Sequence, residues 1–142
     1  MSFKFSLEPV LKVREHREKV QRQKLAEEMK RKQRISEQKE AVQADLEQFL
    51  GQKDKHKVYD VQKLRNSYAH LEHSHNVMGK LERDMQKAED AIHKERNKLV
   101  TAHRETHIME KAKDREFSAW KEDLERNEQK AMDEIATQYY NR

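Results

Sequence analysis

The chain has no cysteine, one proline and only two glycines among its 142 residues. The lack of cysteine excludes disulfides and thiolate chemistry, and it is compatible with an intracellular protein. No apolar run approaches the ~18 residues that a membrane-spanning helix needs. A signal peptide is not expected either, because Lys4, Glu8 and Lys12 interrupt the first apolar residues. We therefore expect a cytoplasmic protein.

The composition is unlike that of an ordinary globular domain. Charged residues make up 41% of the chain and apolar residues 34%, whereas typical domains have about 25% and about 45–50%. Low hydrophobicity with many charges can indicate disorder. Here, however, the opposite charges nearly cancel, to a formal net charge of +4. Because helix formers dominate and helix breakers are almost absent, the composition favours a long helical coiled coil.

The spacing of apolar residues predicts two helices joined by a short turn. Ser6 is the expected N-cap of a first helix over about residues 7–50, with Pro9 early enough to be tolerated. Gly51 is the expected C-terminal stop. A turn over about 51–56 then leads into a second helix over about 57–140. The prediction is an all-α fold: one coiled-coil domain over residues 1–142, a long antiparallel two-helix hairpin with the second helix overhanging.

The two helices differ in the quality of their apolar seams. The seam of the first helix runs through Leu7, Leu11, Leu25, Ile35, Val42, Leu46 and Phe49. Its other positions are polar, namely Arg14, Glu18, Gln21, Glu28, Lys32 and Lys39, so it should hold a partner weakly. In the second helix a row recurs every seven residues, at Leu64, Leu71, Met78, Met85, Ile92 and Leu99. Val61 and Tyr68 fill the companion position at its start, and Leu81, Ala88 and Ala102 widen the stripe from its other flank. Folding at the turn would pair Ile35 with Leu71 and Leu7 with Leu99.

The unequal helix lengths predict an overhang. At 1.5 Å per residue the helices would span roughly 65 and roughly 125 Å, so the second should outreach the first from about residue 104. An exposed apolar stripe usually marks an interaction site, and tryptophan and tyrosine are frequent at binding hot spots. We expect a heterologous partner there, with a homodimer of two overhangs as the alternative. The residues left without an intramolecular partner would be Phe117, Trp120, Leu124, Ile135 and Tyr139.

No enzyme, cofactor or metal site is predicted. Glu72 and His75 have the carboxylate–histidine spacing of di-iron bundles, but such sites need further ligands from facing helices in a closed core. No glycine-rich loop could hold phosphates, and two helices bury no acid–base pair. The stretch 12–39 is net basic. Since acidic residues interleave it at helical spacing, a solvated face or a docking surface for an acidic protein is preferred to nucleic-acid binding.

Both ends of the chain resemble the FliJ family, soluble coiled-coil components of the bacterial flagellar type III export apparatus. At the start the matching residues are Phe3, Phe5, Leu7, Val10, Leu11, Val13, Arg14 and Glu15. At the end they are Glu128, Lys130, Ala131, Met132, Asp133, Glu134, Ile135 and Ala136. FliJ-like proteins resemble the central stalk of rotary ATPases. The resemblance therefore implies a non-enzymatic stalk that promotes the hexamer and the activity of the export ATPase.

The resemblance also implies a partner for each end of the hairpin. The joined termini would enter the ring of the export ATPase, through Phe3, Phe5, Leu7, Phe117, Trp120, Leu124 and Ile135. The hairpin end would reach the cytoplasmic domain of the export gate protein. Position and residue type suggest Phe49, Leu50, Tyr59 and Tyr68 for that contact. Export chaperones are further implied partners, and the inner face of the cell membrane would be reached only through partners. The alternative is a generic coiled-coil scaffold or homodimeric spacer.

Overall fold

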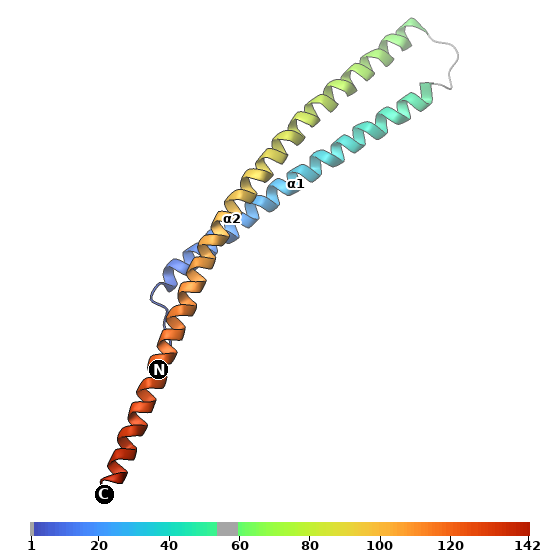
Figure 1. The fold of residues 1–142 in the computed structure, drawn as a ribbon. Coiled ribbons are helices and arrows are strands. Elements are labelled where there is room, and N and C mark those ends of the chain that lie inside the picture. Colours follow the sequence, from blue (N-terminus) through green and yellow to red (C-terminus); the bar gives the residue numbers. More distant parts are fainter. Residues whose placement is uncertain (1, 54–59) are drawn as a thin grey trace. The chain divides into compact units, whose positions relative to one another are not determined.

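A computed structural model describes residues 2–53 and 60–142. These residues form two α-helices, α1 over Glu8–Lys53 and α2 over Val61–Tyr140, and no strand (Figure 1). With 46 residues in α1 and 80 in α2, the predicted all-α pair of long helices is confirmed. Neither helix, as far as it is described, has an apolar stretch that could cross a membrane.

Both predicted ends of the first helix need correction. The amide of Leu11 donates to the carbonyl of Leu7 at 3.0 Å, so Leu7 occupies the N-cap position that was predicted for Ser6. Gly51 does not stop α1, which continues to Lys53. No described glycine has a positive φ, and an exposed glycine inside a helix costs only about 1 kcal/mol. Residues 54–56 of the predicted turn and 57–59 of the predicted second helix lie outside the described residues.

The contacts of the chain divide into two compact units. The terminal unit consists of Met1–Gln21 and Leu99–Arg142, and the middle unit of Arg22–Lys98. In each unit a stretch of α1 packs antiparallel against a stretch of α2. The seam of α1 falls where the sequence predicts from Leu11 onward, whereas Leu7 is exposed. The seam residues that are buried or half-buried are Leu11, Arg14, Glu18, Gln21, Leu25, Glu28, Lys32, Ile35, Lys39, Val42, Leu46 and Phe49.

The core of the middle unit shows that the predicted register is wrong. Ile35 packs with Leu81 and Ala88, with Val42, Val77 and Met85 around them, whereas Leu71 was the predicted partner. The difference is about two heptads along α2. A heptad seam looks the same after every shift of seven residues, so periodicity alone cannot choose the register. The predicted turn made the choice: it was placed at about 51–56, whereas α1 continues to Lys53 and α2 begins at Val61.

The companion row of α2 is also corrected by the middle unit. Val61 and Tyr68 were predicted to lie in the seam, but they are 64% and 72% exposed. The buried companion row contains Ser74 together with Leu81 and Ala88, which were predicted on the other flank of the stripe. This row has small residues at two of its three positions, and small side chains give little signal in an apolar pattern. Val61 and Tyr68 therefore lie on the surface.

Candidate docking site at the chain ends

The terminal unit has a small core made by both ends of the chain. Phe5, Leu11 and Met109 are buried, and Phe3 and Ala112 pack against them. Polar contacts continue the pairing of α1 with α2. The Glu8 carboxylate lies 3.2 Å from the Lys113 ammonium, the Arg14 guanidinium donates to the Glu105 carbonyl at 3.0 Å, and Glu18 lies 2.9 Å from the His103 ring. Thus α2 is paired well beyond residue 104.

The segment before α1 extends this pairing further along α2. The Phe3 ring lies 5.2 Å from Phe117 and 5.8 Å from Trp120, and the rings of Phe117 and Trp120 stack at 5.8 Å. The Ser6 amide and hydroxyl donate to the Glu116 carboxylate at 3.1 and 2.9 Å. We call Phe3, Phe117 and Trp120 the aromatic cluster. It joins the N-terminal segment to α2.

The prediction that Phe117 and Trp120 lack an intramolecular partner is therefore wrong. Part of the reason is the register, which places Glu8 beside Lys113. The rest is the extended segment, because extended chain advances about 3.3 Å per residue and a helix only about 1.5 Å. The cluster still has an open side, since Phe117 is 45% exposed and Trp120 is half-buried.

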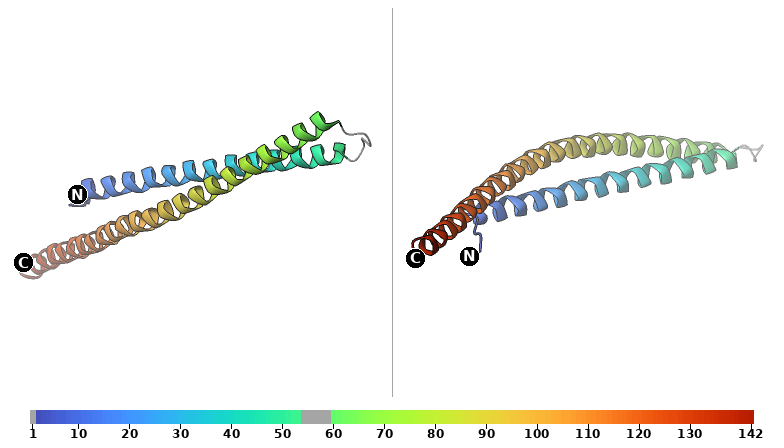
Figure 2. Two further views of the ribbon diagram at one scale, coloured as in Figure 1. Left: turned by 90° about the horizontal axis from the view of Figure 1, so that it is seen from above. Right: turned by 60° about the horizontal axis from the view of Figure 1, so that its bottom comes forward.

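Beyond Trp120, α2 continues to Tyr140, about 30 Å further. In both views of Figure 2 the C-terminal end of α2 extends past the N-terminus. Leu124 is half-buried, and every later residue is exposed. The exposed large apolar side chains along it are Met132, Ile135, Tyr139 and Tyr140, at 66%, 51%, 77% and 91% exposure. We call residues 121–140 the α2 tail. It is shorter than the predicted overhang, but it carries the predicted kind of surface.

The residues expected to contact an ATPase ring thus fall into three environments. Phe5 is in the core, and Phe3, Trp120 and Leu124 are half-buried. Leu7, Phe117 and Ile135 are exposed. The structure brings Phe3, Phe117 and Trp120 together, while Ile135 lies four turns further along α2. The contact of Phe3 with Trp120 could not be predicted from the helical periodicity, because Phe3 precedes the helix.

The residues expected to contact an export gate lie in the middle unit. The Phe49 ring is half-buried and lies 4.5 Å from the His70 ring, which in turn lies 3.5 Å from the Asp45 carboxylate. Leu50 and Tyr68 are exposed. Tyr59 lies outside the described residues. Phe49 therefore contributes to the helix pair, and Leu50 and Tyr68 are the accessible members of the set.

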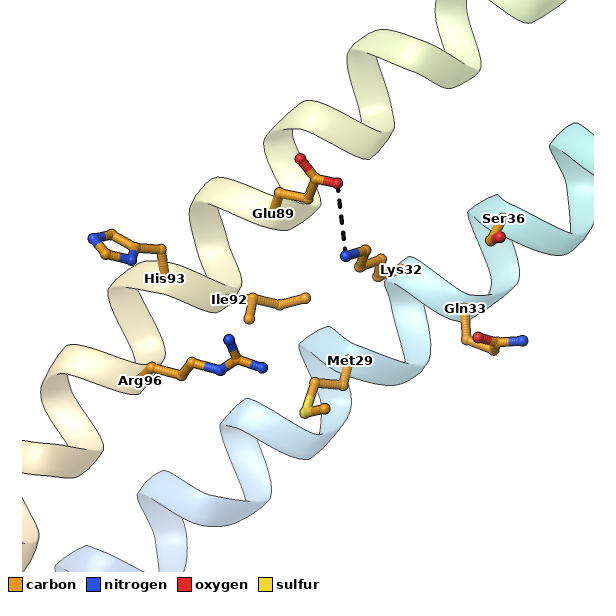
Figure 3. Close-up of a pocket in the computed structure, with 8 residues that line it drawn as sticks. All are labelled: Met29, Lys32, Gln33, Ser36, Glu89, Ile92, His93 and Arg96. Atoms are coloured by element: carbon orange, nitrogen blue, oxygen red, sulfur yellow. Dashed lines mark ion pairs between the residues drawn. The ribbon is translucent and has the colours of Figure 1, made fainter.

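The described residues contain no group of three or more histidine, cysteine or acidic side chains that could hold a metal ion. A groove of about 430 Å³ lies between α1 and α2 in the middle unit, lined by Met29, Lys32, Gln33, Ser36, Glu89, Ile92, His93 and Arg96. The Lys32–Glu89 ion pair, 3.6 Å long, crosses it, and the His93 ring points away from Ser36 (Figure 3). This lining holds no paired nucleophile and base of the kind that catalysis needs.

The described residues form two antiparallel helices with an exposed apolar tail. This fold defines the class of all-α coiled-coil proteins. Residues 3–142 match the family model described as flagellar FliJ protein. The chain belongs to the FliJ family, as its two ends predicted, and it is a component of the flagellar export system. Comparisons with curated proteins and with solved structures gave no match.

Proposed function

We propose that the chain is a non-enzymatic stalk that couples the flagellar export ATPase to the membrane export gate. Membership of the FliJ family places it in the export system. The observation that supports the ATPase contact is the α2 tail, which presents Met132, Ile135 and Tyr139 to solvent. Apolar side chains in this number on an uncovered helix favour a protein partner, since their burial contributes about 25 cal/mol per Å².

The aromatic cluster gives this contact a fixed base. Phe3 packs on Phe117 and Trp120 from the N-terminal segment, so α2 is held where its pairing with α1 ends. A tail that starts from an ordered base loses less conformational entropy on binding than a free one. In this proposal Phe3 and Phe5 fix the N-terminal segment on α2. Phe117, Trp120 and Leu124 form the surface next to the tail, and Ile135 inserts into the ring.

The gate contact is assigned to the part of the middle unit where α1 ends and α2 begins. Leu50 and Tyr68 are exposed there, and tyrosine and other large side chains are favoured at interfaces. Phe49 acts indirectly, through its packing on His70, and Tyr59 is kept on its position in the sequence alone. Contact with the gate would place the chain at the inner face of the cell membrane. Export chaperones are further partners, for which we assign no residues.

The ATPase contact is tested by mixing the chain with the flagellar export ATPase and measuring ATP turnover and hexamer formation. Wild-type chain should stimulate both, and the Ile135→Ser, Tyr139→Ser double variant should lose most of the stimulation. Because both side chains are exposed, the variant should keep its helix content. Ile108→Ser is the matched control, since Ile108 is an exposed isoleucine of α2 outside the tail. Full stimulation by the double variant would refute the ring contact.

The alternative, a homodimeric spacer, makes a different prediction for the chain alone. Sedimentation equilibrium of the wild-type chain should give a monomer if the tail is meant for another protein. A stable dimer that the Ile135→Ser, Tyr139→Ser variant disrupts would favour the spacer and count against the stalk.

A further inference from the structure

The middle unit has two distinct faces along its helix pair. The groove of Figure 3 marks one of them, because Met29, Gln33 and Ser36 of α1 line it together with Glu89 and His93 of α2. Each of these residues follows a seam residue directly. Residues that directly precede the seam lie on the other flank of both helices, as in any antiparallel heptad pair.

One contact between side chains shows that these other flanks meet. Asp45 precedes Leu46 of the α1 seam, and His70 precedes Leu71 of α2. Their side chains lie 3.5 Å apart. The groove is therefore on one face, and the residues before the seam share the opposite one.

This opposite face carries most of the positive charge. Between residues 24–41 and 80–98 it holds seven cations, namely Lys24, Arg31, Arg34, Lys80, Lys87, Lys94 and Lys98, against two carboxylates, Glu27 and Asp84. On the groove face of the same stretch there is one cation, Arg96, and there are three carboxylates, Glu40, Glu82 and Glu89. We call the face that holds the seven cations the basic face. All seven of its cations are exposed, and within the described chain only Lys98 has an ion pair, with Glu95.

The cations of the basic face are regularly spaced. Lys80, Lys87 and Lys94 recur every seven residues, and Lys24 and Arg31 do the same on α1. Seven residues of helix correspond to about 10 Å, so the α2 lysines form a row along one side of the helix pair. Seven cations and two carboxylates leave this face with a net charge of +5, and a face with such an excess of positive charge attracts an anionic surface.

We propose that the basic face binds the surface of an anionic lipid bilayer. The face has no exposed aromatic or large aliphatic residue, and its uncharged members include Gln38, Ala41 and Ala91. Protein interfaces are enriched in aromatic residues and depleted in lysine, and single-stranded nucleic acids need aromatic stacking platforms. Headgroup phosphates in a plane require only a row of cations, and lysines close to an anionic leaflet each strengthen binding about fivefold.

The location of the binding rests on the proposed function, because a flagellar export component works beside the cell membrane. A helix pair that lies along a bilayer cannot also extend from an ATPase ring toward the gate. Bilayer binding would therefore belong to the chain before it engages the ATPase, and it gives the chain a direct membrane contact in addition to those through its partners.

The test is cosedimentation with phosphatidylcholine vesicles that either contain or lack phosphatidylglycerol. The full chain should bind only the anionic vesicles, and the binding should weaken with added salt. Lys80→Gln, Lys87→Gln, Lys94→Gln should weaken it about a hundredfold. The control is Lys111→Gln, Lys121→Gln, Lys130→Gln, which removes the same charge from exposed α2 lysines outside the basic face.

Equal losses in the two triple variants would overturn the proposal, and so would equal binding to both kinds of vesicle. Tighter binding to a double-stranded DNA of matched length than to the anionic vesicles would assign the basic face to nucleic acid and overturn it as well. ATPase stimulation, measured without vesicles, should be unchanged in the Lys80, Lys87, Lys94 variant. If wild-type chain fails to stimulate the ATPase but still binds anionic vesicles, the proposed function fails and the bilayer contact stands.

Discussion

Removal of the Phe3 ring should release the N-terminal segment from α2. Phe3 makes two ring contacts, at 5.2 Å with Phe117 and at 5.8 Å with Trp120. An aromatic pair contributes about 0.5–1.5 kcal/mol beyond the area it buries, and burial of about half a phenylalanine side chain adds about 1 kcal/mol. Phe3→Ala should therefore favour the detached segment by about 2–4 kcal/mol. The bonds of Ser6 to Glu116 are exposed and contribute less.

Tryptophan fluorescence measures this release directly, because Trp120 is the single tryptophan of the chain. In Phe3→Ala the emission of Trp120 should shift to longer wavelength, and acrylamide should quench it more strongly. Phe49→Ala is the control, since Phe49 contacts His70 in the middle unit and should leave the emission unchanged. If Phe3→Ala leaves both the wavelength and the quenching at wild-type values, the aromatic cluster does not hold the segment.

Three further results are expected. Gly79→Ala should raise the free energy of unfolding by about 1 kcal/mol in urea denaturation, because a Cβ there meets no atom closer than 4.0 Å; a lower stability would mean that this part of α2 is more crowded. Met109→Ala, in the buried core, should lower it by about 2–4 kcal/mol, whereas Met132→Ala on the tail should change it by less than about 0.5 kcal/mol. Leu50→Ser with Tyr68→Ser should weaken binding to the export gate domain at least about tenfold in a pull-down titration, and unchanged binding would remove the gate assignment.

The seam of α1 could be predicted because its periodicity does not depend on the partner. Ile35, Val42 and Leu46 face α2, and so do the charged residues between them. The polar seam residues even obtain partners, as Glu18 does from His103. One oxygen of Glu28, however, is buried without a hydrogen bond among the described residues. This fits a seam that holds its partner weakly at this position.

The register and the N-terminal segment could not be predicted in the same way. Ile35 can face Leu71 or, two heptads further along α2, Met85 with equally good heptad alternation, and only the turn at the end of α1 decides between them. That end was assigned to Gly51, because glycine often stops a helix, but a helix also passes through glycine at small cost. Phe3 lies before the first helix, where no periodicity indicates its contacts. Because of these two errors, the uncovered part of α2 was predicted to begin at about residue 104, whereas it begins at residue 121.

The central claim, that the α2 tail enters the ring of the export ATPase, can be tested with single cysteines, because the chain has none of its own. Ile135→Cys places a thiol on the tail, and Ile108→Cys places one at an exposed position outside it. The rate of maleimide labelling is measured for each variant with and without the ATPase hexamer. We predict that the hexamer slows labelling at residue 135 at least about tenfold and leaves residue 108 unchanged. Equal labelling rates at residue 135 with and without the hexamer would contradict the claim.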